Sequence, residues 1–220
     1  LSHAFRVIRE THDWGFFAQA GASPRLVHVP RGKVVGGSSV TNGAIALRGL
    51  PRHYDAWNDY VDGYGWDSWL PWFRRIERDM QFPDAAWHGG DGPIAINRYR
   101  RDEWFPLMER FAAAAEARGH GWVDDHNKPD AIGIGPTPFN MIDGVRQTPA
   151  DHYLEPAIGR PNLTLMSGVI VDRVTLTQGR ATGIDLRDAA GETAHLEADE
   201  VILCLGTYVS PACLLRSGIG

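Results

Sequence analysis

Two glycines, two serines and an asparagine stand close together in the run Arg31–Gly49, whose sequence is RGKVVGGSSVTNGAIALRG. Gly36 and Gly37 have no Cβ, so the backbone at this point can closely approach a flat or charged ligand. Ser38 and Ser39 are good N-cap residues, and we expect a helix to begin here with its free N–H groups facing that ligand. A tight turn before a buried helix would use the same residues, so the pattern alone leaves both interpretations open.

The last twenty residues of the chain, VILCLGTYVSPACLLRSGIG, predict a strand, a turn and a helix. Val201–Leu205 is a continuous apolar run, as expected for a strand covered on both faces in a parallel sheet. Ser210 is a predicted N-cap, Pro211 suits the first helical position, and Gly218 is expected to end the helix. A strand, turn and helix in this order are typical of a nucleotide-binding α/β sheet.

Together, these two segments resemble the signatures of the glucose–methanol–choline (GMC) family of FAD-dependent oxidoreductases. The first signature corresponds to residues 32–42 and the second to residues 206–220. Between them, further matching runs fall in the family's order: Gly65-Trp66-Asp67, Leu70-Pro71-Trp72-Phe73 with Glu77, and Arg160-Pro161-Asn162-Leu163. Thr41 stands where an aliphatic residue is usual and Cys213 where a leucine-like residue is usual, and neither substitution undermines the resemblance.

The resemblance implies a mixed α/β fold, in which a nucleotide-type FAD-binding domain carries an inserted substrate-binding domain. Residues 1–50 and 157–220 would belong to the FAD domain, and residues 51–156 mostly to the substrate side. The family's N-terminal Gly-x-Gly-x-x-Gly turn does not occur here, and its catalytic histidine would lie beyond Gly220. We therefore expect an internal fragment, incomplete at both ends, that has no catalytic residue of its own and is inactive without the rest of the enzyme.

The resemblance also assigns the cofactor contacts. In the run 34–45, the residues expected to line the pyrophosphate and the isoalloxazine of FAD are Val34, Gly36, Gly37, Ser38, Asn42, Gly43, Ala44 and Ile45. Val171 matches a valine whose backbone bonds the adenine edge, although an alternating strand needs its valines for packing in any case. Some family members attach FAD through a histidine at the position of Thr41. Since threonine cannot form that link, we expect non-covalent FAD.

The activity implied is oxidation of the CH–OH group of a small alcohol by hydride transfer to FAD. Two alternatives remain open at this stage. One is lyase chemistry within the same family, as in hydroxynitrile lyases, and the other is a cofactor-free, non-catalytic piece. The sequence does not identify the alcohol or the electron acceptor, nor the oligomeric state or cellular location.

Composition is that of a packed globular protein, with 43% hydrophobic and 22% charged residues. The net charge of −5 and the lack of a basic cluster argue against a nucleic-acid partner. No apolar run approaches membrane-spanning length, and no signal peptide begins at Leu1. Cys204 and Cys213 are too few for a disulfide framework and are predicted to be buried free thiols.

Sequence patterns predict the remaining elements. Helices are expected over residues 51–60, 67–80 and 102–118, with another beginning at Thr148-Pro149. Strands are expected over residues 93–99, 162–166, 169–177, 181–187 and 193–197, with turns at Gln178-Gly179 and Ala190-Gly191. Residues 82–92 and 124–144 are rich in turn formers and predict loops.

Several polar and aromatic groups have a functional and a structural interpretation. The run Asp124-Asp125-His126-Asn127 suggests a metal site, but adjacent residues seldom face one ion and a polar loop is favoured. The histidines at positions 88, 120 and 126 do not match the family's catalytic position and are predicted to be solvated or structural. Four tryptophans, at positions 57, 66, 69 and 72, are predicted to be core residues rather than a substrate platform.

Overall fold

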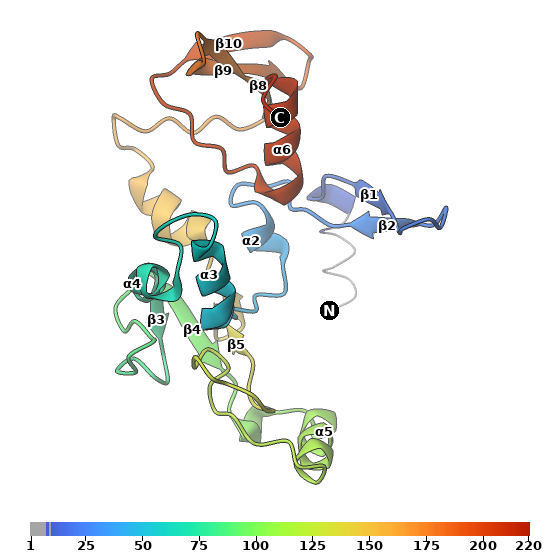
Figure 1. Ribbon diagram of the computed structural model, residues 1–220, viewed down its shortest axis with the longest axis vertical. Helices are drawn as coiled ribbons and strands as arrows, with labels where there is room; N and C mark the ends of the chain where they lie inside the picture. Colours follow the sequence, from blue (N-terminus) through green and yellow to red (C-terminus); the bar gives the residue numbers. More distant parts are fainter. Residues whose placement is uncertain (1–7, 9) are drawn as a thin grey trace. The chain divides into compact units, whose positions relative to one another are not determined.

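The computed structural model describes Ile8 and residues 10–220; residues 1–7 and Arg9 lie outside the described part. The chain divides into two compact units, Leu1–Gly159 and Arg160–Gly220 (Figure 1). No helix in the described part is both long enough and apolar enough to cross a membrane.

The first unit begins with an antiparallel hairpin of β1 (Phe16–Gln19) and β2 (Leu26–Val29), which the sequence patterns did not predict. Asp13 fastens its open end, since its carboxylate accepts hydrogen bonds from the backbone N–H groups of Gly15 and Arg31 and from the ring of His28. Burial would raise the pKa of Asp13, but these hydrogen bonds outweigh it and lower the pKa. The hairpin leads directly into the glycine-rich run.

Two helices, α3 (Pro51–Asn58) and α4 (Trp66–Ile76), pack through aromatic side chains. The ring of Tyr54 lies 5.6 Å from that of Trp66 and 5.4 Å from that of Phe73, measured between centroids. Of the four tryptophans predicted as core, Trp57 and Trp72 are exposed instead. The prediction was wrong for these two because short helices have only one face against the core.

A three-stranded sheet forms the centre of the first unit. It contains β3 (Glu77–Asp79), β4 (Ile94–Arg98) and β5 (Pro138–Phe139), with β3–β4 parallel and β4–β5 antiparallel. The predicted strand 93–99 is thereby confirmed, whereas the helix predicted to reach residue 80 ends at Ile76 because the next residues pair with β4. A small hairpin of β6 (Met141–Ile142) and β7 (Val145–Arg146) follows.

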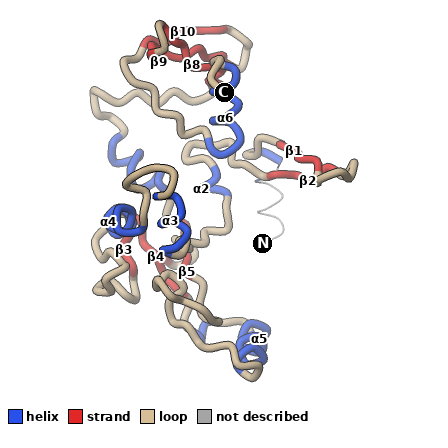
Figure 2. Tube along the Cα trace, in the orientation of Figure 1, coloured by secondary structure: helices blue, strands red, loops and turns tan. Residues whose placement is uncertain are grey.

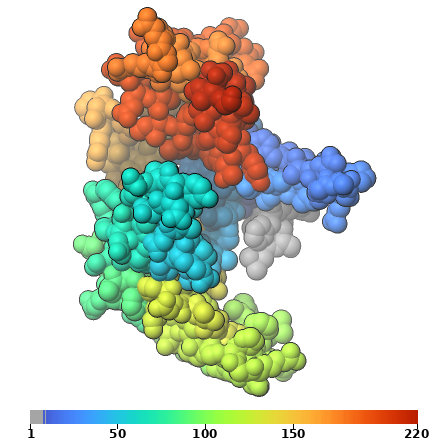
Figure 3. All heavy atoms as spheres, in the orientation of Figure 1, coloured from blue at the N-terminus to red at the C-terminus, as the bar shows by residue number. Residues whose placement is uncertain are grey.

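The predicted helix 102–118 is divided in two, a 3₁₀ turn η1 (Arg101–Glu103) and α5 (Pro106–Glu116). The division falls at Phe105, because a residue that precedes proline is disfavoured in the α conformation. Figure 3 shows the surface of this region, with α5 at one end of its unit. The helix predicted at Thr148 is a π-helical turn η2 (Ala150–Leu154) followed by a 3₁₀ turn η3 (Glu155–Ala157).

The second unit is an antiparallel meander covered by one helix (Figure 2). Its strands are β8 (Val169–Thr177), β9 (Arg180–Asp188) and β10 (Thr193–Glu197), as predicted to within a residue. Helix α6 (Gly206–Arg216) packs against β8, and the small core contains Val174, Leu186 and Cys213. These three strands could be predicted from the sequence because β-branched residues alternate along them and tight turns separate them.

Two strands predicted in the second unit do not form. Residues 162–166 and 201–205 have no strand partner among the described residues, because an apolar run becomes a strand only where a neighbouring strand completes its hydrogen bonds. Helix α6 begins at Gly206, so Ser210 is not its N-cap; its hydroxyl accepts the N–H of Leu205 instead. Pro211 lies inside the helix. Cys213 is buried as predicted, but Cys204 is exposed.

Candidate functional site

The glycine-rich run Val34–Ile45, here called the flavin loop, is folded tightly by its glycines. A Cβ on Gly32 would lie 2.6 Å from the carbonyl oxygen of Gly37, so only glycine allows this approach. Gly37 has φ +57° and ψ −141°, a conformation that side-chain-bearing residues rarely adopt. The glycines therefore determine the path of the loop.

The serines of the loop act differently from the prediction. Helix α2 (Ser38–Thr41) is a single turn with Gly37 at its N-cap, and no side chain caps it. The Ser38 hydroxyl accepts the N–H of Gly32, and the Ser39 hydroxyl donates to the carbonyl of Gly36. Both hydroxyls therefore close the loop on itself instead of capping a long helix.

One side of the flavin loop is open. The backbone N–H groups of Val35, Gly36 and Gly43 have no acceptor within the described part of the chain. A Cβ on Gly37 would meet no atom within 4 Å, and the side chains of Val34 and Ile45 are exposed. Open donors beside exposed apolar side chains fit a flat aromatic ring system with polar edges, and the isoalloxazine of FAD is such a group.

Asn42 and Ala44 hold the far end of the loop. The Asn42 carboxamide oxygen accepts the N–H of Ala44 at 2.8 Å and a hydrogen bond from the guanidinium of Arg146 on β7. Ala44 is buried with φ +59°, and its carbonyl accepts the N–H of Asn140. Burial lowers the pKa of Arg146. Sequence reasoning missed Arg146, because its partner lies more than a hundred residues away.

The other predicted cofactor residue, Val171, lies on β8 of the second unit, opposite Leu186 on β9. The register shifts between Val171 and Arg173, so the strand is irregular directly beside it. The structure thus brings together the predicted residues of the flavin loop in one unit, and Val171 belongs to the other.

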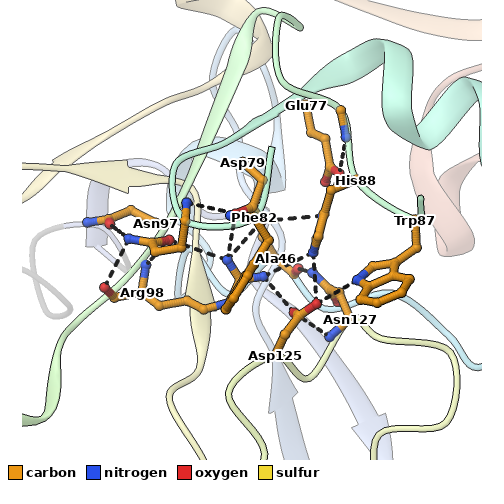
Figure 4. Close-up of polar contacts among 12 residues, drawn as sticks. Ala46, Glu77, Asp79, Phe82, Trp87, His88, Asn97, Arg98, Asp125 and Asn127 are labelled. Atoms are coloured by element: carbon orange, nitrogen blue, oxygen red, sulfur yellow. Dashed lines mark hydrogen bonds and ion pairs between the residues drawn. The ribbon is translucent and has the colours of Figure 1, made fainter. Parts of the chain in front are cut away.

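The first unit contains a buried cluster of charged side chains (Figure 4). His88 has no exposed surface, and its two ring nitrogens face two carboxylates. Its Nδ1 lies 2.7 Å from Oε1 of Glu77, and its Nε2 lies 2.9 Å from Oδ2 of Asp125. Burial would lower the pKa of His88, but the hydrogen bonds to Asp125 and Glu77 outweigh it and raise the pKa.

Two arginines balance the carboxylates of this cluster. Arg98 on β4 donates from Nη1 to both oxygens of Asp79, at 2.9 and 2.8 Å, and from Nη2 to Oδ1 of Asp125 at 2.7 Å. Arg48 forms an ion pair with Glu77. Hydrogen bonds and these positive charges lower the pKa of Glu77 and of Asp125, against the effect of burial.

Asn127 connects the cluster to the chain that leaves the flavin loop. Its backbone N–H donates to Oδ1 of Asp125 at 2.9 Å. Its side chain bonds two backbone groups at once, accepting the N–H of Arg48 at 2.9 Å and donating to the carbonyl of Ala46 at 3.0 Å. We use the name clasp for this pair of hydrogen bonds.

The cluster agrees in part with the sequence predictions. His88 is structural, and residues 124–127 form a polar loop. The participation of Glu77, Asp79 and Arg98 was missed. The available signal was that Glu77 and Asp79 alternate with Arg78 on one short strand, and that Arg98 ends a mostly apolar one. Charged residues are rarely buried in such strands without a partner of opposite charge.

Comparison with known proteins identifies the family. Residues 17–220 match the family model described as GMC oxidoreductase. The chain belongs to the GMC oxidoreductase family. The resemblance of the two signatures is thereby confirmed, and so is the predicted mixed α/β fold.

Individual GMC proteins match over almost the whole chain. An oxygen-dependent choline dehydrogenase of Brucella anthropi is 34% identical over 220 residues, covering 99% of this chain and 39% of that protein. The crystal structure of pyridoxine 4-oxidase from Mesorbium loti has a TM-score of 0.90 at 35% identity, covering 98% of this chain and 43% of that one. An FAD-dependent oxidoreductase from Chaetomium thermophilum has a TM-score of 0.85 at 26% identity, covering 96% and 39%. This GMC chain therefore spans about two fifths of the length of the relatives it matches.

Proposed function

We propose that this GMC chain forms part of a flavin-dependent oxidoreductase that oxidises the CH–OH group of a small alcohol. The observation that carries the proposal is the open side of the flavin loop, where the N–H groups of Val35, Gly36 and Gly43 meet no acceptor among the described residues. Its relatives support the reaction class, since they include an FAD-dependent oxidoreductase and enzymes named for choline and pyridoxine, both alcohol-type compounds.

The residues proposed to hold FAD are Val34, Gly36, Gly37, Ser38, Asn42, Gly43, Ala44 and Ile45, together with the backbone of Val171. When bound, FAD supplies a hydride acceptor for the alcohol carbon. The loop N–H groups would donate hydrogen bonds to polar edges of the flavin or to phosphate oxygens. The exposed side chains of Val34 and Ile45 would cover the ring and exclude water. We assign no catalytic base within this chain.

Anaerobic reduction tests the proposed reaction. Choline and pyridoxine would be added in turn, without oxygen, to the purified yellow flavoprotein that contains this chain. We expect one alcohol to bleach the flavin absorbance and to yield one equivalent of aldehyde per FAD. A flavin that stays oxidised with a broad panel of alcohols would contradict the proposal, and cleavage of an α-hydroxynitrile by such a protein would indicate the lyase chemistry instead.

We also propose that FAD is bound without a covalent link, because Thr41 has no nucleophilic nitrogen to attach it. Thr41 is the last residue of α2, inside the loop that would face the ring. Acid precipitation of the flavoprotein should leave the yellow colour in the supernatant. A yellow pellet after acid treatment would show that another residue forms a covalent bond.

A further inference from the structure

The geometry of His88 requires two protons on its ring. Each ring nitrogen lies within 2.9 Å of a carboxylate oxygen, and an ionised carboxylate can only accept a hydrogen bond. A neutral imidazole has one N–H, so it would leave one nitrogen lone pair facing an anion in a buried site. The guanidinium of Arg98 also faces Nε2, but its Nη2 lies 3.4 Å away, farther than the Asp125 oxygen at 2.9 Å. Donation from both nitrogens to the nearer carboxylates satisfies this arrangement, and the ring then carries a positive charge.

The buried cluster is electrically neutral only if His88 carries its second proton. Three carboxylates, those of Glu77, Asp79 and Asp125, meet two guanidinium groups, those of Arg48 and Arg98. Arg74 of α4 faces the backbone of His88, donating from Nε to its carbonyl at 2.9 Å, and Trp87 donates its indole N–H to Asp125. A charged His88 brings the three carboxylates, Arg48 and Arg98 to neutrality, which a buried ionic cluster requires.

The cluster leads by unbroken hydrogen bonds to the exit of the flavin loop. His88 donates to one oxygen of Asp125, and the other oxygen accepts the backbone N–H of Asn127. The Asn127 side chain then forms the clasp on Ala46 and Arg48. Ala46 follows Ile45, the last residue of the flavin loop, and its N–H is separately bonded to the carbonyl of Pro138.

We propose that His88 is a buried imidazolium which, acting through Asp125 and Asn127, is a positioning residue for the backbone that leaves the flavin loop. The statement about flavin rests on the proposed function. The charge of His88 and the clasp do not, and they can be measured on this chain without cofactor.

The protonation of His88 is tested by NMR of the chain labelled with ¹⁵N in histidine. An unperturbed imidazole is neutral at pH 8, whereas we expect His88 to show two protonated ring nitrogens at that pH. The His88→Gln variant assigns the signal by its loss, and His120→Gln, which changes an exposed histidine, is the matched control. A single protonated nitrogen on His88 at pH 8 would overturn the proposal.

The positioning step is tested by hydrogen exchange at the amide of Arg48. Asn127→Ala should speed this exchange roughly tenfold, the order expected for one lost hydrogen bond, and His88→Gln should speed it in the same direction. The Ala46 amide, bonded to Pro138, is the internal control and should keep its protection.

Trp87→Phe is the matched variant, because it removes one hydrogen bond to Asp125 without changing any charge. Equal exchange rates in wild type and His88→Gln would overturn the positioning role. Should His88→Gln fail to fold, Asp125→Asn replaces it in both measurements: it removes a carboxylate that His88 contacts, so it should shift the His88 signal and speed Arg48 exchange, and unchanged exchange would overturn the positioning role.

The effect of the positioning role on cofactor binding is tested by measuring FAD affinity in the flavoprotein that contains this chain. We expect Asn127→Ala to weaken FAD binding several-fold, measured by flavin fluorescence on dilution, while Trp87→Phe leaves it unchanged. Faster Arg48 exchange with unaltered FAD affinity would overturn the link to flavin. A protein that takes up no FAD at all would contradict the proposed function itself. The NMR and hydrogen-exchange measurements need no cofactor, so they would still test the charge of His88 and the clasp in that case.

Discussion

Gly37 has two features that favour glycine: an unusual backbone conformation and open space on the side where a Cβ would point. Its φ of +57° disfavours any side chain, while a Cβ there would meet no protein atom. Gly21 in the hairpin turn, with φ +60° and equally open space, shares the first requirement but not a place in the flavin loop. Comparing substitutions at the two glycines therefore distinguishes the effect of backbone strain from the effect of blocking a ligand.

We expect Gly37→Ala to lower FAD occupancy strongly and Gly21→Ala to leave it unchanged. Each change should cost about 1 kcal/mol in the free energy of unfolding, because alanine disfavours a positive φ. Flavin absorbance per protein and urea unfolding of the same samples are the measurements. Full FAD occupancy in Gly37→Ala would mean that the glycine serves only the turn.

Arg98 and Arg100 are close in sequence and differ in burial. Removing the Arg98 guanidinium in Arg98→Met leaves Asp79 and Asp125 buried with less compensation, so we expect a loss of about 3–5 kcal/mol in the free energy of unfolding. Arg100→Met breaks an exposed pair with Asp102, which solvent screens, so we expect only a small fraction of that loss. Urea unfolding measures the free energy of unfolding of both variants. Equal losses would contradict a special contribution of the buried cluster to stability.

At the scale of elements, the cluster joins β3, β4 and the loops around residues 88 and 125, so its titration should appear in the stability of the first unit. The lowered pKa values of Glu77 and Asp125 give stability that is present above their ordinary range and lost as the pH falls through the lowered values. The raised pKa of His88 gives stability that is present below its ordinary value and lost as the pH rises through the raised value.

The free energy of unfolding should therefore be greatest between about pH 4.5 and 6.5, the ordinary pKa values of Glu77 and His88. Urea unfolding across pH 3–9 measures this. In His88→Gln the decline on the alkaline side should disappear, whereas His120→Gln should keep it. A stability that does not change from pH 6 to 9 in the wild-type chain would argue against a charged His88.

The turn between β8 and β9 offers a test of local geometry. Gln178 and Gly179 both have positive φ, +51° and +79°, as in a type I′ turn. Asparagine tolerates this conformation better than glutamine, so Gln178→Asn should stabilise the second unit by about 0.5 kcal/mol. Thermal unfolding measures the change, with the exposed strand substitution Thr193→Asn as control. A destabilised Gln178→Asn would show that the turn is of another type.

At the scale of the whole molecule, one patch of exposed apolar surface lies around α5. A hollow of about 490 Å³ lies between this helix and residues 134–139, and its lining includes Trp104, Leu107, Phe111 and Phe139. Leu107 and Phe111 are both exposed. An apolar patch of this kind promotes association in water.

We expect the 220-residue chain to self-associate as its concentration rises, and the double substitution Leu107→Lys with Phe111→Lys to reduce this. Light scattering across a concentration series measures the association. Circular dichroism checks that the fold is kept, and a pair of lysines at the exposed positions Ile202 and Tyr208 is the control for added charge. Association that is unchanged by the α5 substitutions but abolished by the control would place the adhesive surface on the second unit.

Local patterns predicted a good part of this fold. The meander β8–β10 was predicted because β-branched residues alternate there and glycine marks its turns. The helix beginning at Pro51 and the strand β4 were likewise predicted from the sequence. Patterns failed where an element depends on a distant partner, as in Val201–Leu205, which pairs with no strand in the described part of the chain. They also failed for the β1–β2 hairpin, whose residues do not alternate clearly.

The sequence by itself determined the family and the tight backbone path of residues 32–37, because a chain that must bend at Gly32, Gly36 and Gly37 excludes side chains and so leaves a recognisable spacing. Only the tertiary structure decided that His88 lies between Glu77 and Asp125. It also decided that Arg146 bonds Asn42 inside the loop and that Asn127 bonds the backbone that leaves it. The physical reason is that a charged or amide side chain has many candidate partners along a chain. Which one it meets depends on how segments far apart in the sequence pack, and no local spacing records that.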